Sequence, residues 1–329
     1  MSEILHTPIS VDLREPLVTA HATIFRRRGF LLGIRHNGKK YVSEVTLLPE
    51  FGTEHFEHAE RILEGESMML LSAPACVFGL DMLHRAMEQR DDKELRVPIT
   101  KLLPSGSNKE IITAARQAAL ESFDTVKLKV GFRKLEEDIA LVNTLALELP
   151  ELVIRLDANM GWSPDDVIAF AKELPREAVE WIEDPCRVSM ELWHALQEEV
   201  GIPFACDEAF GEKEILEHEG DPGFKALVIK PARMGPLTER KPLLEKMRKY
   251  EIPVIMSSMF DTSVGLAHLA HLASHWSSLE IAQGLGTLHM LKTDTLEPGL
   301  AVEAGHLVVP PLAELADKLM PDYTRALDL

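Results

Sequence analysis

The sequence predicts an α/β fold, a modified TIM-type (β/α)8 barrel with an N-terminal α+β capping domain. Short apolar runs typical of strands alternate with helical patterns eight times between Val97 and Gly286. Polar residues recur near the ends of these runs, at steps of 28, 26, 24, 23 and 27 residues from Lys129 to Ser257. The segment before Val97 lacks this repeat. A repeating β/α unit of about 25 residues is typical of a (β/α)8 barrel.

Residues 1–95 are predicted to form the capping domain. An antiparallel hairpin is expected to turn at Asn37-Gly38, because these residues tolerate the positive φ angles of a tight turn. Helical patterns follow at His55–Leu63 and Ala75–Gln89.

Two connections of this domain are expected to cover the barrel mouth and to contact the substrate. One is the loop Leu17–Gly29 with Thr23 and Arg26, and the other is the turn that contains Phe51 and Gly52.

Residues 96–289 are predicted to form the barrel, and the tail 290–329 is expected to pack back on the cap and complete it. An open doubly wound sheet shares the same alternation, but the strand TVKLKV has no Gly-rich turn after it, and the polar landmarks fall at the carboxyl ends of the strands. The eight predicted strands are 97–103, 125–130, 152–158, 179–184, 202–208, 226–231, 253–258 and 280–286.

Composition restricts the partners of the chain. With 35 Lys+Arg against 53 Asp+Glu, the net charge is −18, which disfavours nucleic acid and anionic membrane surfaces. No apolar run approaches the roughly 20 residues of a membrane span, and the start of the chain lacks a secretory signal. The three cysteines form no C-x-x-C pair. We therefore expect a cytoplasmic protein with a small-molecule partner, while the oligomeric state stays open.

Acidic residues end three consecutive predicted strands: Asp157 in RLDAN, Glu183 in WIEDP and Asp207 in CDEAF. On adjacent strands of a barrel these carboxylates meet at the mouth, where their mutual repulsion requires a cation. Oxygen-only ligands suit Mg²⁺ or Mn²⁺ better than Zn²⁺.

Lysines are predicted on the strands beside this acidic group. Lys127 and Lys129 are two residues apart on one strand, so both side chains face the barrel interior, and Lys230 reaches the mouth from a later strand. A neutral lysine can remove a proton, and burial, a metal ion and the neighbouring Lys127 all lower the pKa of Lys129. Arg155 is expected either to brace a ligand from the layer below or to form an ion pair, and Asn159 either to orient a ligand or to form a turn.

The ordered motifs VKLKVG, LDANMGW, WIEDP, CDEAF and KPARMG resemble the enolase superfamily, in its muconate-lactonizing-enzyme subgroup. The resemblance covers nearly the whole chain. It implies that Asp157, Glu183 and Asp207 bind Mg²⁺ and that Lys129 and Lys230 flank the substrate. Abstraction of a proton α to a carboxylate creates an enediolate, whose added negative charge the metal stabilises.

The subgroup includes cycloisomerases, dipeptide epimerases, N-succinylamino-acid racemases and o-succinylbenzoate synthases. The segment MSSMFDTSVG, with Ser257 and Ser258, resembles the S-S-x-x-[DE]-[ST]-x-x-G pattern of the synthases. Dipeptide epimerases typically end the eighth strand with D-x-D, where this chain has Gly284 and Gly286.

These small residues leave room for a ring with a succinyl arm. The resemblance therefore implies a dehydration in menaquinone synthesis, with Lys129 as general base and acid. An N-succinylamino-acid racemase or a dipeptide epimerase is the alternative, and a catalytically silent binding barrel is disfavoured because a binding role needs no paired lysines.

Overall fold

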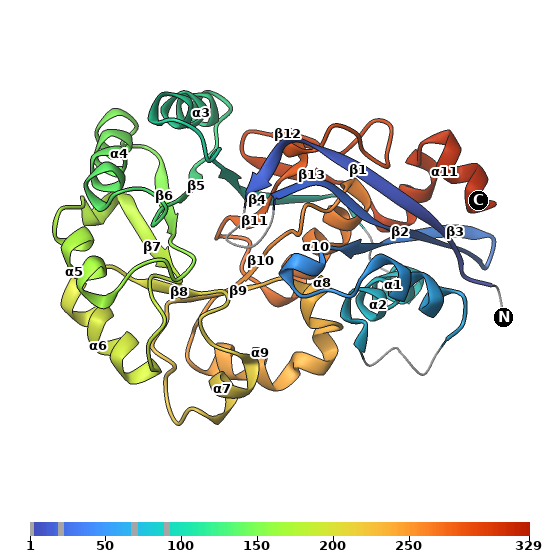
Figure 1. Cartoon of the computed structure of the whole chain (residues 1–329). Coiled ribbons are helices and arrows are strands. Elements are labelled where there is room, and N and C mark those ends of the chain that lie inside the picture. The colour runs from blue at the N-terminus through green and yellow to red at the C-terminus, as the bar shows by residue number, and fades with distance from the viewer. Residues whose placement is uncertain (1–2, 19–22, 67–71, 89–92) are drawn as a thin grey trace.

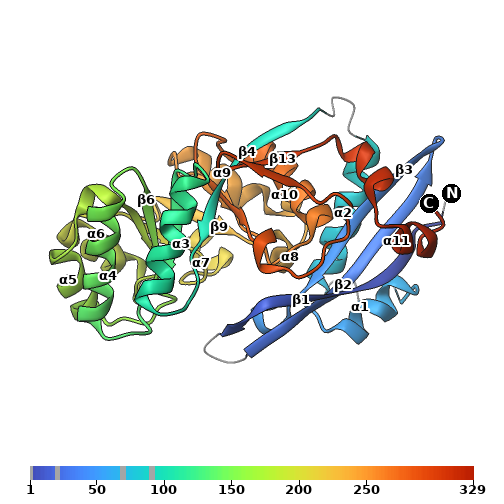
Figure 2. The ribbon, with the colours of Figure 1, turned by 90° about the horizontal axis from the view of Figure 1, so that it is seen from above.

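The computed structural model describes residues 3–18, 23–66, 72–88 and 93–329 of the chain. Figure 1 shows a three-stranded sheet with two helices on the right and a barrel of strands and outer helices on the left. In the view from above, these two parts lie side by side, and the N- and C-terminal ends are close together beside the sheet (Figure 2). None of the helices in the described part of the chain is long and apolar enough to cross a membrane.

The three-stranded sheet is antiparallel and has the order β1 (Leu5–Val18), β2 (Thr23–His36), β3 (Lys39–Leu47). The predicted turn between β2 and β3 is confirmed, with φ of 51° at Asn37 and 75° at Gly38. The strand β1 was not predicted. The predicted loop Leu17–Gly29 is wrong for its described residues, because β1 extends through Leu17 and β2 begins at Thr23, while residues 19–22 lie outside the description.

The short 3-10 helix η1 (Pro49–Phe51) and the helices α1 (Phe56–Leu63) and α2 (Pro74–Glu88) follow β3. Both predicted helices are thus present, although Gln89 lies outside the described residues. Helix α2 packs against β3, and its face toward the sheet is apolar, with Phe78, Met82 and Leu83 buried. This sheet and its helices are called the cap below.

The barrel contains eight parallel strands, and each predicted strand coincides with one of them. The ring runs in sequence order from β4 to β10, β11 pairs with β4, and a bridge between Ser257 and Gly284 joins the ends of β10 and β11. The predicted barrel class is therefore confirmed. The strands are β4 (Leu95–Leu102), β5 (Thr125–Lys129), β6 (Val153–Asp157), β7 (Val179–Glu183), β8 (Phe204–Cys206), β9 (Ala226–Ile229), β10 (Val254–Met256) and β11 (Gln283–Gly286).

Outer helices cover the barrel strands, so several of these strands are buried on both faces, as in ALVI of β9. Local signals fix where the helices begin: Ser107 with Glu110, and Ser163 with Asp166, form capping boxes. The helices are α3 (Asn108–Leu120), α4 (Leu135–Glu148), α5 (Pro164–Lys172), α6 (Met190–Val200), α7 (Glu212–Glu217), α8 (Pro231–Met234), α9 (Lys241–Lys249) and α10 (Ser263–Trp276), with 3-10 turns η3 (Arg176–Ala178) and η4 (Leu237–Arg240).

The tail contacts both parts of the molecule. After η5 (Leu288–Met290), the hairpin of β12 (Ala301–Glu303) and β13 (His306–Val309) adds antiparallel strands next to β4. The segments η6 (Leu312–Lys318) and α11 (Pro321–Ala326) then return to the cap, where Arg35 Nε donates to the Asp328 carbonyl at 2.9 Å. The tail thus extends the barrel sheet before it reaches the cap.

Candidate active site

The polar residues predicted from the strand ends meet at one mouth of the barrel. Lys129, Asp157 and Glu183 are the last residues of β5, β6 and β7, and they are register partners across these strands. Asp207 follows β8 and Lys230 follows β9. All five side chains line one cavity of about 290 Å³. Since β5 and β9 are four strands apart in a ring of eight, Lys129 and Lys230 approach the cavity from opposite sides.

Ammonium groups lie among the three carboxylates. Lys127 Nζ is 2.8 Å from Asp157 Oδ2 and 2.7 Å from Glu183 Oε1, and Lys230 Nζ contacts Asp207 Oδ2. Within the described parts of the chain, no three side chains of metal-binding type converge into a ready-made cage. The lysines therefore offset the negative charge in this arrangement.

The electrostatic environment of the three acidic side chains indicates whether a divalent cation fits the site. Burial, with the nearby charges of Asp157 and Asp207, raises the pKa of Glu183 to about 8 in spite of Lys127. Burial also acts to raise the pKa of Asp157, but the Lys127 ammonium holds it below the usual value. Three acidic side chains that line one cavity and depend on nearby cations fit Mg²⁺ or Mn²⁺, which would offset the same repulsion. Their assignment as metal ligands stays a prediction.

The two opposed lysines differ in their electrostatic environment. Burial lowers the pKa of Lys129, and the charges of Lys127 and Lys230 lower it further against the opposing effect of Asp157. For Lys230, burial is outweighed by Asp207 and Glu208, which raise the pKa. The environment therefore shifts Lys129 toward its neutral form and Lys230 toward its cationic form.

Arg155 and Asn159 lie where the sequence places them, and their contacts distinguish between the alternatives stated for each. Arg155 lies one layer below Asp157, where its Nε binds Glu180 Oε2 at 2.6 Å and its Nη1 donates to Thr100 Oγ1 at 2.8 Å. These contacts correspond to the ion-pair alternative. Asn159 lines the cavity with a φ of 45°, and its backbone N–H, at 3.1 Å, donates to Asp157 Oδ1. The turn of the chain therefore orients the carboxylate.

The remaining wall of the cavity contains most of the residues predicted to contact substrate. Ser257, Ser258, Gly284 and Gly286 line it from the barrel, and Phe51 lines it from the cap. The prediction that Gly52 contacts the substrate is corrected, because Gly52 does not line the cavity. Its φ of 94° turns the chain, and a Cβ at this position would lie 3.3 Å from the Arg233 side chain. Its role is to shape the turn that presents Phe51.

Thr23 and Arg26 of the cap were expected to contact the substrate, and this expectation is corrected. Arg26 Nε binds Asp12 Oδ1 at 2.5 Å on the exposed face of the cap, and neither Arg26 nor Thr23 lines the cavity. Leu17, at the end of β1, does line it.

Sequence reasoning missed two acidic residues that hold the site together. Glu208 Oε1 lies 3.3 Å from Lys230 Nζ and accepts from Arg233 Nη1 at 2.5 Å. The buried Asp184 accepts backbone N–H groups of Asp207 and Glu208 at 3.0 and 2.7 Å. Both directly follow a predicted ligand in sequence, so a signal was available in the pairs Glu183-Asp184 and Asp207-Glu208.

The fold and these strand-end residues define the class of the protein: a capped (β/α)8 barrel with its polar site at the carboxyl ends of the strands. The family model described as "Enolase C-terminal domain-like" matches residues 110–313, and the chain belongs to that family.

Curated and solved relatives agree with this placement. The chain is 29% identical over 294 residues to an o-succinylbenzoate synthase from Proteus mirabilis, with 86% of this chain and 89% of the relative covered. An o-succinylbenzoate synthase from Thermosynechococcus elongatus, solved with Mg in its active site, superposes with a TM-score of 0.72 at 23% identity over 89% of this chain and 95% of that one. A dipeptide epimerase from Enterococcus faecalis, complexed with Mg and a dipeptide, superposes with a TM-score of 0.80 at 21% identity. The superposition covers 94% of this chain and 98% of the epimerase. These two structures support the fold.

Proposed function

We propose that this protein is a Mg²⁺-dependent o-succinylbenzoate synthase of menaquinone biosynthesis. The reaction is the syn dehydration of 2-succinyl-6-hydroxy-2,4-cyclohexadiene-1-carboxylate to 2-succinylbenzoate. The observation that carries the proposal is a cavity with Lys129 and Lys230 on opposite sides, three carboxylates between them, and a wall of serines and glycines. The similarity to curated synthases over 86% of the chain supports this choice of substrate.

Lys129 is the proposed general base. Its lowered pKa favours the neutral amine, which takes the ring proton α to the substrate carboxylate. The resulting ammonium then gives its proton to the departing hydroxide on the same face, so that water leaves and the ring becomes aromatic. When bound by Asp157, Glu183 and Asp207, Mg²⁺ would neutralise the charge that the substrate carboxylate gains.

Lys230 is the proposed electrostatic partner. Asp207 and Glu208 raise its pKa and favour its cationic form, which supplies positive charge opposite Lys129 without taking part in proton transfer. Ser257, Ser258 and the glycines of β11 form the wall that would face the succinyl arm.

An N-succinylamino-acid racemase is the second candidate, because lysines on opposite sides permit proton transfer on both faces of a carbon. A dipeptide epimerase is less favoured, since β11 ends in Gly284-Leu285-Gly286 and offers no carboxylate there to a substrate ammonium.

The deciding experiment is an assay of the purified protein with Mg²⁺ and each substrate in parallel. We expect the cyclohexadiene to be converted to the aromatic product, followed by ultraviolet absorbance. Rapid racemisation of N-succinylamino acids without formation of 2-succinylbenzoate would instead support the racemase.

A further inference from the structure

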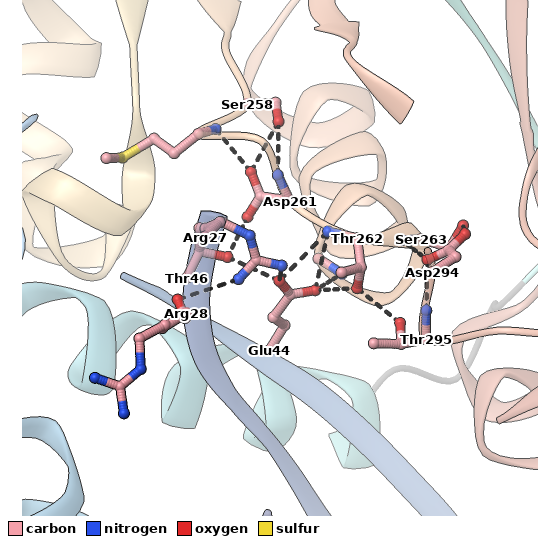
Figure 3. A network of polar contacts seen from close by, with 12 residues as sticks. Arg27, Arg28, Glu44, Thr46, Ser258, Asp261, Thr262, Ser263, Asp294 and Thr295 are labelled. Atoms are coloured by element: carbon pink, nitrogen blue, oxygen red, sulfur yellow. Dashed lines mark hydrogen bonds and ion pairs between the residues drawn. The ribbon is translucent and has the colours of Figure 1, made fainter. Parts of the chain in front are cut away.

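A hydrogen-bond network connects the cap to the cavity wall (Figure 3). Thr46 on β3 donates its hydroxyl to Asp261 Oδ1 at 2.6 Å. The other oxygen of Asp261 accepts the Met259 backbone N–H at 2.8 Å and the Ser258 hydroxyl at 2.9 Å. Thr46 and Asp261 are 2% and 3% exposed, and neither lines the cavity. A cap residue thus acts on the wall through one buried carboxylate.

The wall in question is the segment 257–260, whose four residues all line the cavity. Phe260 has a φ of 61°, in the left-handed region that a residue with a large side chain rarely adopts. Such a conformation persists only where surrounding contacts fix it. The hydrogen bonds between Asp261 and the residues Ser258 and Met259 hold the backbone just before Phe260 in place. The Ser258 N–H also donates to the Gly284 carbonyl at 2.9 Å, which connects the segment to β11.

Thr46 is itself held in place by Glu44. Glu44 Oε1 lies 3.1 Å from the Thr46 hydroxyl and 2.5 Å from Arg27 Nη2, and both charged side chains are buried. The same carboxylate accepts backbone N–H groups at the start of α10, from Thr262 at 3.2 Å and from Gly265 at 3.0 Å. The cap strand and the start of α10 therefore share one buried carboxyl group as an anchor.

We propose that Thr46 and Asp261 are positioning residues for the substrate wall 257–260, so that the cap sets the geometry of the barrel pocket. The inference rests on the proposed function only for its kinetic readout. Because the wall contacts the substrate before and during the reaction alike, loss of its geometry weakens binding more than it slows chemistry.

The first test compares Thr46→Val with Thr46→Ser. Valine removes the hydroxyl at nearly constant volume, whereas serine retains it. Loss of a hydrogen bond corresponds to about a fivefold rise in KM for Thr46→Val, with kcat changed less. Thr46→Ser should restore KM to within about twofold of the wild type. A purely structural role for Thr46 would lower thermal stability and the active fraction, and therefore kcat, at an unchanged KM, and that result overturns the proposal.

The second test does not depend on the substrate. Hydrogen exchange measured by mass spectrometry on peptides spanning 257–262 should be faster in Thr46→Val than in wild type and Thr46→Ser. Unchanged exchange in the valine variant overturns the positioning role, even if the wild type proves to catalyse another reaction. Faster exchange with a wild-type KM overturns the link to substrate binding.

A second variant covers the case in which Thr46→Val does not fold. Asp261→Ala removes the acceptor from the same network and should raise KM in the same way. Where both variants fold, their effects should be non-additive, since each breaks the same connection. Additive effects on KM contradict an action through one path.

Discussion

Lys129 and Asp157 are register partners on β5 and β6, and each is the last residue of its strand. Adjacent strands lie about 4.8 Å apart, so the proposed base is fixed one strand away from a proposed metal ligand. In the proposed reaction, backbone pairing rather than flexible loops would therefore place the base beside the α carbon and the metal ligand beside the adjoining carboxylate.

Metal removal is the first prediction. Activity should vanish after exhaustive chelation with EDTA and return with Mg²⁺ or Mn²⁺, because an enediolate needs a counter-charge. Asp157→Asn, Glu183→Gln and Asp207→Asn should each weaken Mg²⁺ binding in calorimetry and lower turnover by several orders of magnitude. Unchanged Mg²⁺ affinity in all three variants would place the ligands elsewhere.

The two lysines give the second prediction. Lys129→Ala should reduce dehydration by roughly a hundredfold to ten-thousandfold, the usual contribution of a general base. Lys230→Arg retains positive charge and should keep more dehydratase activity than Lys230→Ala. The arginine variant should also lose any racemisation of N-succinylamino acids, because arginine does not act as a base near neutral pH. Equal loss of dehydration in both Lys230 variants would argue against a purely electrostatic role.

The third prediction concerns pH. Lys129 must be neutral to accept a proton, so kcat/KM should rise as the pH increases through its lowered pKa. Lys127 is one of the charges that lower this pKa, and Lys127→Met therefore raises it. The ascending limb of the pH profile should move to higher pH at saturating Mg²⁺.

The matched control is Lys127→Arg, which keeps the charge and should leave that limb closer to its wild-type position. A limb that stays in place in Lys127→Met, or moves to lower pH, would show that Lys127 does not tune the base.

The fourth prediction separates two glycines of β11. A Cβ at Gly286 would lie 2.2 Å from the Thr100 carbonyl oxygen, whereas at Gly284 the nearest atom is Ser257 Oγ at 3.0 Å. Gly286→Ala should therefore destabilise the fold by about 1–3 kcal/mol or more, as overpacking does. Gly284→Ala should cost less. Urea unfolding of both variants tests this ranking, and equal losses would contradict it.

Much of the barrel could be predicted because its signals are local. Apolar runs mark the strands, and polar residues such as Asp157 and Glu183 stand at their ends, where parallel pairing brings them together. The hairpin at Asn37-Gly38 was equally visible, since the positive φ of its turn limits the residue types that fit.

The contribution of the cap could not be predicted in the same way. Strand β1 lacks a clear turn signal at its end, so Leu17 was assigned to a loop although it lines the cavity from the strand. Thr46 and Asp261 are 215 residues apart in sequence, and no local pattern reports a contact that only tertiary packing creates. Glu208 was overlooked because its neighbour Asp207 already explained the motif.

At Gly265 an added Cβ would lie 2.8 Å from Asp261 Cβ and 3.0 Å from Glu44 Oε2, so atoms from the cap and from the loop after β10 leave no volume for a side chain. This close approach restricts how the two parts can be exchanged between relatives. A chimaera that receives a foreign cap must also receive matching residues at positions 44, 46, 261 and 265, or its domains will meet with a clash or an unpaired charge. Exchanges of the cap that keep these four positions unchanged avoid this clash.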